Sequence, residues 1–286
     1  MLSASDLSGL AGLVEPDFAP LFPAARPAGE EDGFALYTAG DLRLGFAQVP
    51  TEGDLERTSR ELYRRLFRVS AGWQLFRVWN QVPAINVVSP QGLENYRAFS
   101  AGRSLAFEDH FGGGFAGQLP AASGVGAAGS DLLLAFVAGR ETPRHFENPE
   151  QVPAYHYPTE HGPRPPSFAR ATVARGAGHA LVFISGTAAI KGHKTVSPFA
   201  LPGQLISTLD NLSLIGAAAG LGRELGAGPK WRRYFKVYYR HAADRSAIAA
   251  VLNKSLLLSS DQVVWREADL CRADLLVEVE ATLVGA

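Results

Sequence analysis

The residues best suited to chemistry lie near the end of the chain, in a stretch that reads L-C-R-A-D-L-L-V-E-V-E-A from residue 270 to 281. It holds the only cysteine, Cys271, and two carboxylates, Glu278 and Glu280. Apolar and polar residues alternate as in a strand, and residues two apart on a strand share a face. We expect one acid to face solvent. If the other lines a pocket, burial would raise its pKa and make it a proton donor.

Three arginines are candidates for binding an anionic ligand, because a guanidinium can donate two parallel hydrogen bonds to a carboxylate. Arg164 and Arg170 flank a proline-rich loop, and Arg240 ends an apolar segment. Arg164 and Arg240 each stand where the chain leaves regular structure, which favours a ligand role. Ordinary surface charge is the alternative, and it fits most of the 27 Lys and Arg residues.

The histidines and the cysteine give weaker signals. His156 and His161 are five apart, and no Asp or Glu completes a metal-binding spacing with them. For His193 a structural role is the simpler interpretation, and Cys271 is more typical of a small buried side chain than of a nucleophile. The sequence contains no G-x-S-x-G motif. We therefore predict no metal site.

Two glycine motifs could hold a ligand through the backbone. Gly124, Gly126 and Gly129 match G-x-G-x-x-G, but no strand precedes them and a strand-like run follows, so we predict a loop entering a strand and no cofactor. After Phe183, the stretch I-S-G-T-A-A-I-K-G-H-K places Gly186 where successive amides could hold an oxygen. A plain turn is the alternative there.

Composition limits the class of protein. The chain has 286 residues, of which 47% are hydrophobic and 19% charged, so it should fold around a substantial core. Its net charge is −1 with no long basic run, which argues against a nucleic-acid partner. No apolar run is long enough for a membrane span, and the start does not read as a signal peptide. We predict a cytoplasmic protein.

Strands and helices alternate along both halves of the chain, which predicts an α/β (α+β) fold. The expected strands are two turned at residues 39–41 within 34–49, then 75–80, 132–137, 180–185, 234–239 and 275–284. The expected helices are 55–69, a segment beginning near 93, 204–219 and 242–252. The second half repeats the pattern of the first, so we predict two related units, residues 1–150 and 151–286.

Several motifs together resemble one family, the chorismatases, also called chorismate hydrolases or 3-hydroxybenzoate synthases. They are R-V-W-N-Q-V-P-A-I-N at 77–86, N-Y-R-A-F-S-A-G-R at 95–103, Y-H-Y-P at 155–158, G-P-R-P-P-S-F-A-R at 162–170, F-I-S-G-T-A-A-I-K-G-H at 183–193 and the closing C-R-A-D-L-L-V-E-V-E. The second half alone is also similar to the YjgF/Rid family. The resemblance implies two YjgF/Rid-like subdomains with mixed sheets packed against helices, the second holding most of the active site.

The resemblance also implies an activity. Members of this family release pyruvate from chorismate, and a glutamate on the last strand, which matches Glu278, protonates the enolpyruvyl methylene. Arg164, Arg240 and Arg170 are then candidates for binding the two substrate carboxylates, and Tyr157 is a further hydrogen-bond donor.

Two positions resemble the members that make 3-hydroxybenzoate, namely Gly186 and Cys271. Members that form a dihydrodiol look to have Ala and Gln there. The implied route is attack by the ring hydroxyl of the substrate in place of water. A dihydrodiol product, or a mixture with 4-hydroxybenzoate, stays an alternative. So does a non-enzymatic binding module. A Rid-like imine deaminase is less favoured, because its carboxylate-binding arginine corresponds to Val263. A monomer and a homotrimer both remain open.

Overall fold

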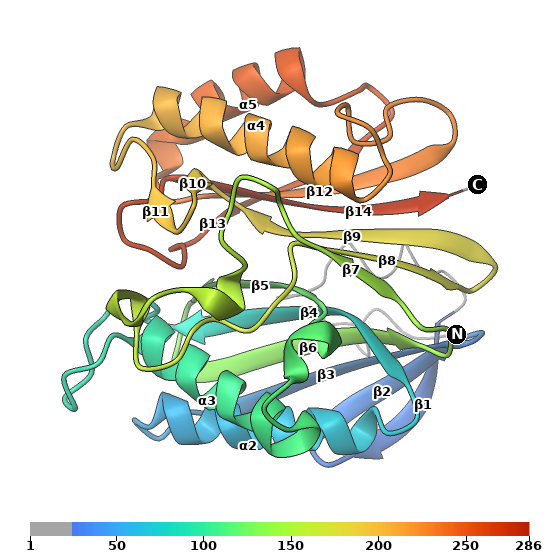
Figure 1. Ribbon diagram of the computed structural model, residues 1–286, viewed down its shortest axis with the longest axis vertical. Helices are drawn as coiled ribbons and strands as arrows, with labels where there is room; N and C mark the ends of the chain where they lie inside the picture. Colours follow the sequence, from blue (N-terminus) through green and yellow to red (C-terminus); the bar gives the residue numbers. More distant parts are fainter. Residues whose placement is uncertain (1–24, 286) are drawn as a thin grey trace.

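Two mixed β-sheets lie face to face at the centre of the molecule, with helices on their outer sides (Figure 1). The structure is a computed structural model that describes residues 25–285. Residues 1–24 and 286, which the predicted halves include, lie outside the described residues. The strands of the first sheet all precede residue 140 and those of the second begin at residue 144. The α+β class predicted from the sequence is confirmed, and the division near residue 150 stays a prediction.

The first sheet has the strand order β1-β2-β3-β6-β4-β5, and only the β4–β5 pair is parallel. Its strands are β1 (Arg26–Glu31), β2 (Phe34–Ala39), β3 (Leu42–Pro50), β4 (Gln74–Pro83), β5 (Ala121–Ala127) and β6 (Asp131–Gly139). Helices α2 (Leu55–Val69) and α3 (Asn95–Phe111) cover its outer face, and a 3-10 turn, η1 (Phe115–Gln118), leads into β5. The predicted hairpin and first helix are thus confirmed. The Asp54 carboxylate caps α2 by accepting a 2.9 Å hydrogen bond from the Arg57 amide.

The second sheet has the order β13-β12-β14-β9-β8-β7, and only β12 and β13 run parallel. Its strands are β7 (Arg144–Phe146), β8 (Ala171–Gly176), β9 (His179–Thr187), β12 (Trp231–Tyr239), β13 (Gln262–Glu267) and β14 (Val277–Gly285). Helices α4 (Leu201–Ala218) and α5 (Arg245–Ser255) cover its outer face (Figure 1). Shorter elements connect them: η2 (Ala154–His156), η3 (Thr159–His161), the hairpin β10 (Ile190–Lys191) with β11 (Lys194–Thr195), and η4 (Ala242–Asp244).

Strand β14 is buried along its whole length, because it pairs with β9 on one side and β12 on the other. Its odd-numbered residues, such as Val279 and Ala281, belong to the core under α4 and α5. Its even-numbered residues face the first sheet, and Val284 belongs to the core between the two sheets. Both faces of the closing strand are therefore covered, as for central strands of sheets buried between two layers.

The two halves also meet through hydrogen bonds at the edge strand β5. The Ala122 amide donates to the Ser185 hydroxyl at 2.8 Å, and that hydroxyl donates to the Ala169 carbonyl at 2.6 Å. Next to Ser185 the pairing of β9 with β14 is irregular, because its register passes from Thr187↔Val279 to Ile184↔Ala281. A bulge of this kind re-aims neighbouring side chains. It lies at Ser185–Gly186.

Some sequence-based expectations were wrong. Strands β8 and β13 were not predicted, and the glycine-rich stretch is partly strand β5 instead of a loop. Gly126 is needed there for space, because a Cβ at this position would come within 2.8 Å of the Asp269 Cβ. Gly186 also lies within a strand and not in a turn. Within residues 25–285, no helix combines the length and apolar character needed to cross a membrane.

Candidate active site

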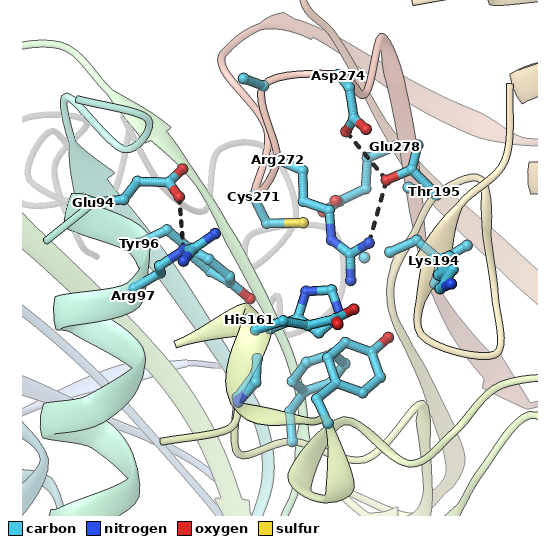
Figure 2. A pocket seen from close by; sticks show the side chains of 18 of the residues that line it. Glu94, Tyr96, Arg97, His161, Lys194, Thr195, Cys271, Arg272, Asp274 and Glu278 are labelled. Carbon is cyan, nitrogen blue, oxygen red and sulfur yellow. Dashed lines mark hydrogen bonds and ion pairs between the residues drawn. The ribbon is translucent and has the colours of Figure 1, made fainter. Parts of the chain in front are cut away.

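A cavity of about 620 Å³ opens where the two halves meet (Figure 2). Its wall is formed by the start of α3, the connection between residues 157 and 170, the end of β9, the hairpin β10–β11 and the segment 271–278. A much smaller cavity, of about 20 Å³, adjoins it and is lined by several of the same residues. Charged groups from both halves line the larger cavity, so it suits a polar ligand.

Glu278 lies at the inner end of the cavity and is only 3% exposed. Burial raises the pKa of its carboxyl to about 8, and the negative charge of Glu280 adds to this, while Arg77 and Arg170 oppose it. Among the residues that the structure describes, no cation forms an ion pair with Glu278. The carboxyl is therefore protonated at neutral pH and can act as an acid, as the sequence indicated.

Glu280 is not exposed, contrary to the expectation that one of the two acids faces solvent. It is 4% exposed, and its carboxylate accepts hydrogen bonds from Arg77 Nη2 at 2.6 Å and Trp79 Nε1 at 2.9 Å. Lys236 Nζ lies 3.4 Å away. The face of β14 that carries Glu280 was expected to be exposed to solvent, but the first sheet covers it.

The two neighbouring acids consequently differ in charge. Burial by itself raises the pKa of Glu280, but the charges of Arg77 and Lys236 and its hydrogen bonds outweigh burial, so its pKa lies below the ordinary value. Glu280 is an anion whose charge adds to the effect of burial in keeping its neighbour Glu278 neutral. Pairs of acids whose environments separate their pKa values in this way are typical of acid–base sites.

Gly186 leaves room for the Glu278 carboxyl. A Cβ at this position would clash with Glu278 Oε1, lie 2.7 Å from its Cδ and lie 3.3 Å from Ser123 Cβ. Real Cβ atoms do not approach so closely, so a Cβ here would require the Glu278 carboxyl, the end of a flexible side chain, to shift. The predicted site residue Gly186 thus lies beside Glu278, and its missing side chain leaves room for the Glu278 carboxyl.

Cys271 lies on the cavity wall in the same region as Glu278 (Figure 2). Burial raises the pKa of its thiol to about 12, and the charge of Glu278 acts in the same direction. The thiol therefore stays protonated at neutral pH, which does not suit a nucleophile. What Cys271 offers is a small, weakly polar surface next to the acid.

Tyr157 and Arg170 also line the cavity, as predicted. Arg170 Nη2 donates a 2.8 Å hydrogen bond to the Tyr157 hydroxyl. Its Nε has no hydrogen-bond partner and lies 4.0 Å from Glu147 Oε2. Arg170 is thus held between Tyr157 and Glu147, with its side chain at the cavity wall.

Arg164 and Arg240 are not brought to the cavity wall, and other groups of the chain take up their donors. Arg164 pairs with Glu108 and lies 3.2 Å from the Ser104 hydroxyl. Arg240 pairs with Asp269 and donates to the carbonyls of residues 275 and 272 at 2.8 and 2.9 Å. These contacts indicate that Arg240 fixes the segment that carries Cys271.

Sequence reasoning did not select Arg103, a buried cation at the base of the site. Arg103 is 2% exposed and lines the small cavity together with Glu278, Cys271 and Gly186. Its Nε and Nη2 have no hydrogen-bond partner. A buried guanidinium with unpaired donors is costly unless a ligand or water completes its bonds. The polar residues of the motif N-Y-R-A-F-S-A-G-R, unusual on a helix of small residues, were the available signal.

A neutral acid in a cavity with guanidinium groups nearby can give a proton to an anionic ligand, and comparison with known proteins identifies the family of the chain. Residues 22–138 match the family model described as chorismatase FkbO/Hyg5-like, N-terminal. The chain is 36% identical over 271 residues to a 3-hydroxybenzoate synthase of Streptomyces hygroscopicus, covering 90% of this chain and 78% of the relative. A chorismatase of Streptomyces rapamycinicus is 35% identical over 277 residues, covering 93% and 82%.

A solved structure of a chorismatase agrees with this result. The crystal structure of a chorismatase superposes with a TM-score of 0.80 at 35% identity and covers 90% of this chain and 80% of that chain. A YjgF-family protein of Neisseria meningitidis covers 51% of this chain at 18% identity, with a TM-score of 0.34. The chain belongs to the chorismatase family.

Proposed function

We propose that the protein converts chorismate to 3-hydroxybenzoate and pyruvate. The observation that carries this proposal is the neutral Glu278 carboxyl at the inner end of a cavity, with the guanidinium groups of Arg170 at the wall and of Arg103 in the adjoining small cavity. Chorismate is a dicarboxylate with an enol ether, so its cleavage needs a proton donor and fixed cations. A relative named 3-hydroxybenzoate synthase supports this choice of product.

Glu278 starts the reaction by giving its proton to the methylene carbon of the enolpyruvyl group. The ether carbon then becomes electrophilic, and the C–O bond between the ring and the ether oxygen weakens. The ring hydroxyl oxygen attacks the ring carbon that carries the ether, and pyruvate leaves with the ether oxygen as its carbonyl. The epoxide then opens by breaking the C–O bond to the carbon that first carried the hydroxyl, and its oxygen takes up a proton. The carbon that keeps the oxygen loses its proton, and the ring becomes aromatic. The hydroxyl proton returns to Glu278, so neither water nor a net proton is consumed.

Arg103 and Arg170 are the proposed partners of the substrate carboxylates. Arg103 has two guanidinium nitrogens without a hydrogen-bond partner, and both arginines line the cavities around Glu278. A carboxylate supplies the two acceptors that such a planar group needs. Tyr157, held by Arg170, adds a hydroxyl at the same wall. Arg164 and Arg240 have an indirect role in this proposal. Arg164 holds the 162–170 connection against α3, and Arg240 holds the segment that carries Cys271.

Gly186 and Cys271 are the proposed determinants of the product. Both are small and both border Glu278, so together they set the space above the reacting carbon. Larger residues there would shift the ring relative to the acid and change what can attack the activated carbon. The alternative product, a dihydrodiol, requires an ordered water at that point.

The test is to incubate the purified protein with chorismate, to measure pyruvate with lactate dehydrogenase and NADH, and to identify the ring product by chromatography. We expect equal amounts of pyruvate and 3-hydroxybenzoate. Glu278→Gln, which keeps the shape but has no acidic proton, should lose at least about 100-fold of the rate. Glu61→Gln, on the exposed side of α2, is the matched control and should keep it.

Pyruvate release that is unchanged in Glu278→Gln would contradict the proposed acid. Binding of chorismate without any pyruvate would favour the non-enzymatic module. A dihydrodiol as the main product would keep the acid but overturn the roles of Gly186 and Cys271.

A further inference from the structure

Glu160, His161 and His193, whose side chains are of types that commonly bind metals, come together at the wall of the cavity. The rings of both histidines pack against Tyr157. His161 Nε2 lies 2.9 Å from His193 Nδ1, and Glu160 Oε1 lies 3.4 Å from the first and 3.3 Å from the second. The three ligand atoms thus form a nearly equilateral triangle. In the sequence this cluster was not apparent, because His193 is 32 positions from His161.

The size of this triangle matches a tetrahedral metal site. Ligand atoms that lie ~2.1 Å from a tetrahedral ion stand about 3.4 Å from one another. Two of the three separations already have this value, and the two imidazoles need to open by only about 0.5 Å. Glu160 is exposed, so its carboxylate can follow such an adjustment without moving the backbone.

The backbone around both histidines is already fixed. His161 closes the 3-10 turn η3, where its amide bonds to the Pro158 carbonyl at 3.0 Å. His193 lies in the turn of the β10–β11 hairpin, and Arg272 donates to its carbonyl at 2.9 Å. Next to it, the Gly192 amide donates to the Glu150 carbonyl at 2.8 Å. The ligands therefore need little ordering when a metal binds, which favours binding.

The composition of the cluster selects the kind of ion. Two imidazoles and one carboxylate suit zinc, cobalt and similar transition metals, whereas magnesium and calcium prefer oxygen ligands. Arg272 lies close to both histidines, and its positive charge disfavours ions held mainly by charge. Bonding to imidazole nitrogen is less affected.

We propose that Glu160, His161 and His193 bind one divalent transition-metal ion at the wall of the cavity. Glu160 and His161 line the cavity, so the fourth coordination position faces the space in which a ligand would bind. Glu278 is not one of the ligands of this metal site, and both histidine rings pack against Tyr157 on the wall of the same cavity. The metal site does not depend on the proposed reaction.

The experiment is a titration of the full-length, untagged protein with Co²⁺, followed by visible absorption. Four-coordinate Co²⁺ absorbs more strongly than hydrated Co²⁺, so the band reports the geometry of the site. We expect saturation at one equivalent, displacement by Zn²⁺, and no displacement by a large excess of Mg²⁺.

Variants identify the ligands. His161→Gln and His193→Gln should each weaken Co²⁺ binding by more than the ~10- to 100-fold typical of losing an outer-shell partner. Glu160→Gln should weaken binding less, because a water can replace it. His156→Gln removes an exposed histidine of the same connection and should bind as the wild type does. Circular dichroism in chelator checks that each variant is folded.

Two results would overturn the proposal. One is the absence of a saturable band in the wild type. The other is a band that persists in the folded histidine variants or disappears in His156→Gln. If a histidine variant did not fold, Glu160→Gln would decide the question, because it changes only an exposed side chain. An unchanged affinity of this variant for Co²⁺ would also reject the proposed site. Co²⁺ binding and pyruvate release are measured independently. Either proposal can therefore be rejected while the other stands.

Discussion

The pH dependence of pyruvate release is the most direct consequence of burying Glu278 beside Glu280. With a pKa of about 8, roughly nine in ten molecules carry the Glu278 proton at pH 7. A carboxyl at its ordinary pKa would carry it in roughly one molecule in several hundred. We therefore expect kcat/KM to be level below about pH 7 and to fall tenfold per pH unit above about pH 8.

Glu280→Gln should move this alkaline limb to lower pH. Residues two apart on a strand are separated by about 7 Å, and at an effective dielectric constant of about 20 two unit charges then interact by about 2 kcal/mol. That energy corresponds to roughly 1 to 2 pKa units. Arg77 and Lys236 remain in the variant and favour ionised Glu278 as well, so the limb should begin near pH 6 to 7.

A matched control is needed because the same variant leaves Arg77 buried without its carboxylate, which costs about 3 to 5 kcal/mol of stability. Asp261→Asn breaks a second buried ion pair, with Arg233, that lies outside the cavity wall. It should destabilise the protein to a similar extent without moving the pH profile. Both variants are assayed by coupled pyruvate release at a temperature at which circular dichroism shows them folded. The reasoning is refuted if the limb stays in place in Glu280→Gln, or moves equally in Asp261→Asn.

Three further outcomes follow from the site. First, the raised pKa of Glu278 stabilises the fold at low pH, and this contribution is lost as pH rises toward 8. The unfolding free energy of Glu278→Gln, measured in urea, should therefore gain about 3 kcal/mol relative to the wild type between pH 5 and 8. A difference that is constant over this range would contradict this reasoning. Second, Arg170→Gln should raise KM for chorismate about 10- to 100-fold in protein that circular dichroism shows to be folded, whereas Arg240→Gln should lower the melting temperature and leave KM nearly unchanged; a raised KM in Arg240→Gln alone would return Arg240 to the binding role. Third, Gly186→Ala with Cys271→Gln should shift the product toward the dihydrodiol on chromatography, and an unchanged product would reject both as determinants.

Local periodicity was sufficient for the elements that pack through one regular face. Helix α2 was predicted from the spacing of Leu55, Leu62 and Leu66, and all three are buried. Strands β8 and β13 were missed because their signal is weak: β8 is rich in small residues, and β13 is a half-buried edge strand. Edge strands owe their place to the neighbour that they pair with, and a single segment does not carry that information.

The site shows the same division between local and distant information. Glu278, Gly186, Cys271 and the pair Tyr157–Arg170 were selected from the sequence and do lie around one cavity. The exposure of Glu280 was predicted wrongly, because alternation along a strand shows which residues share a face and not what covers that face. Arg103 and the His161–His193 contact depend on segments far apart in the chain. No spacing rule brings such residues together.

The ion pair between Arg77 and Glu280 joins residues 203 positions apart, and the Trp79 hydrogen bond spans 201. The electrostatic environment of the acid is therefore completed only after nearly the entire chain has been synthesised and both sheets have docked. Contacts of such long range form slowly, because the loop they close must first lose its conformational freedom. Catalytic competence should accordingly appear late during refolding, after the helical signal has recovered. An isolated second half would keep Glu278, Glu280 and Lys236 but lose Arg77 and Trp79, so the pKa values of its two carboxyls should lie closer together than in the whole protein.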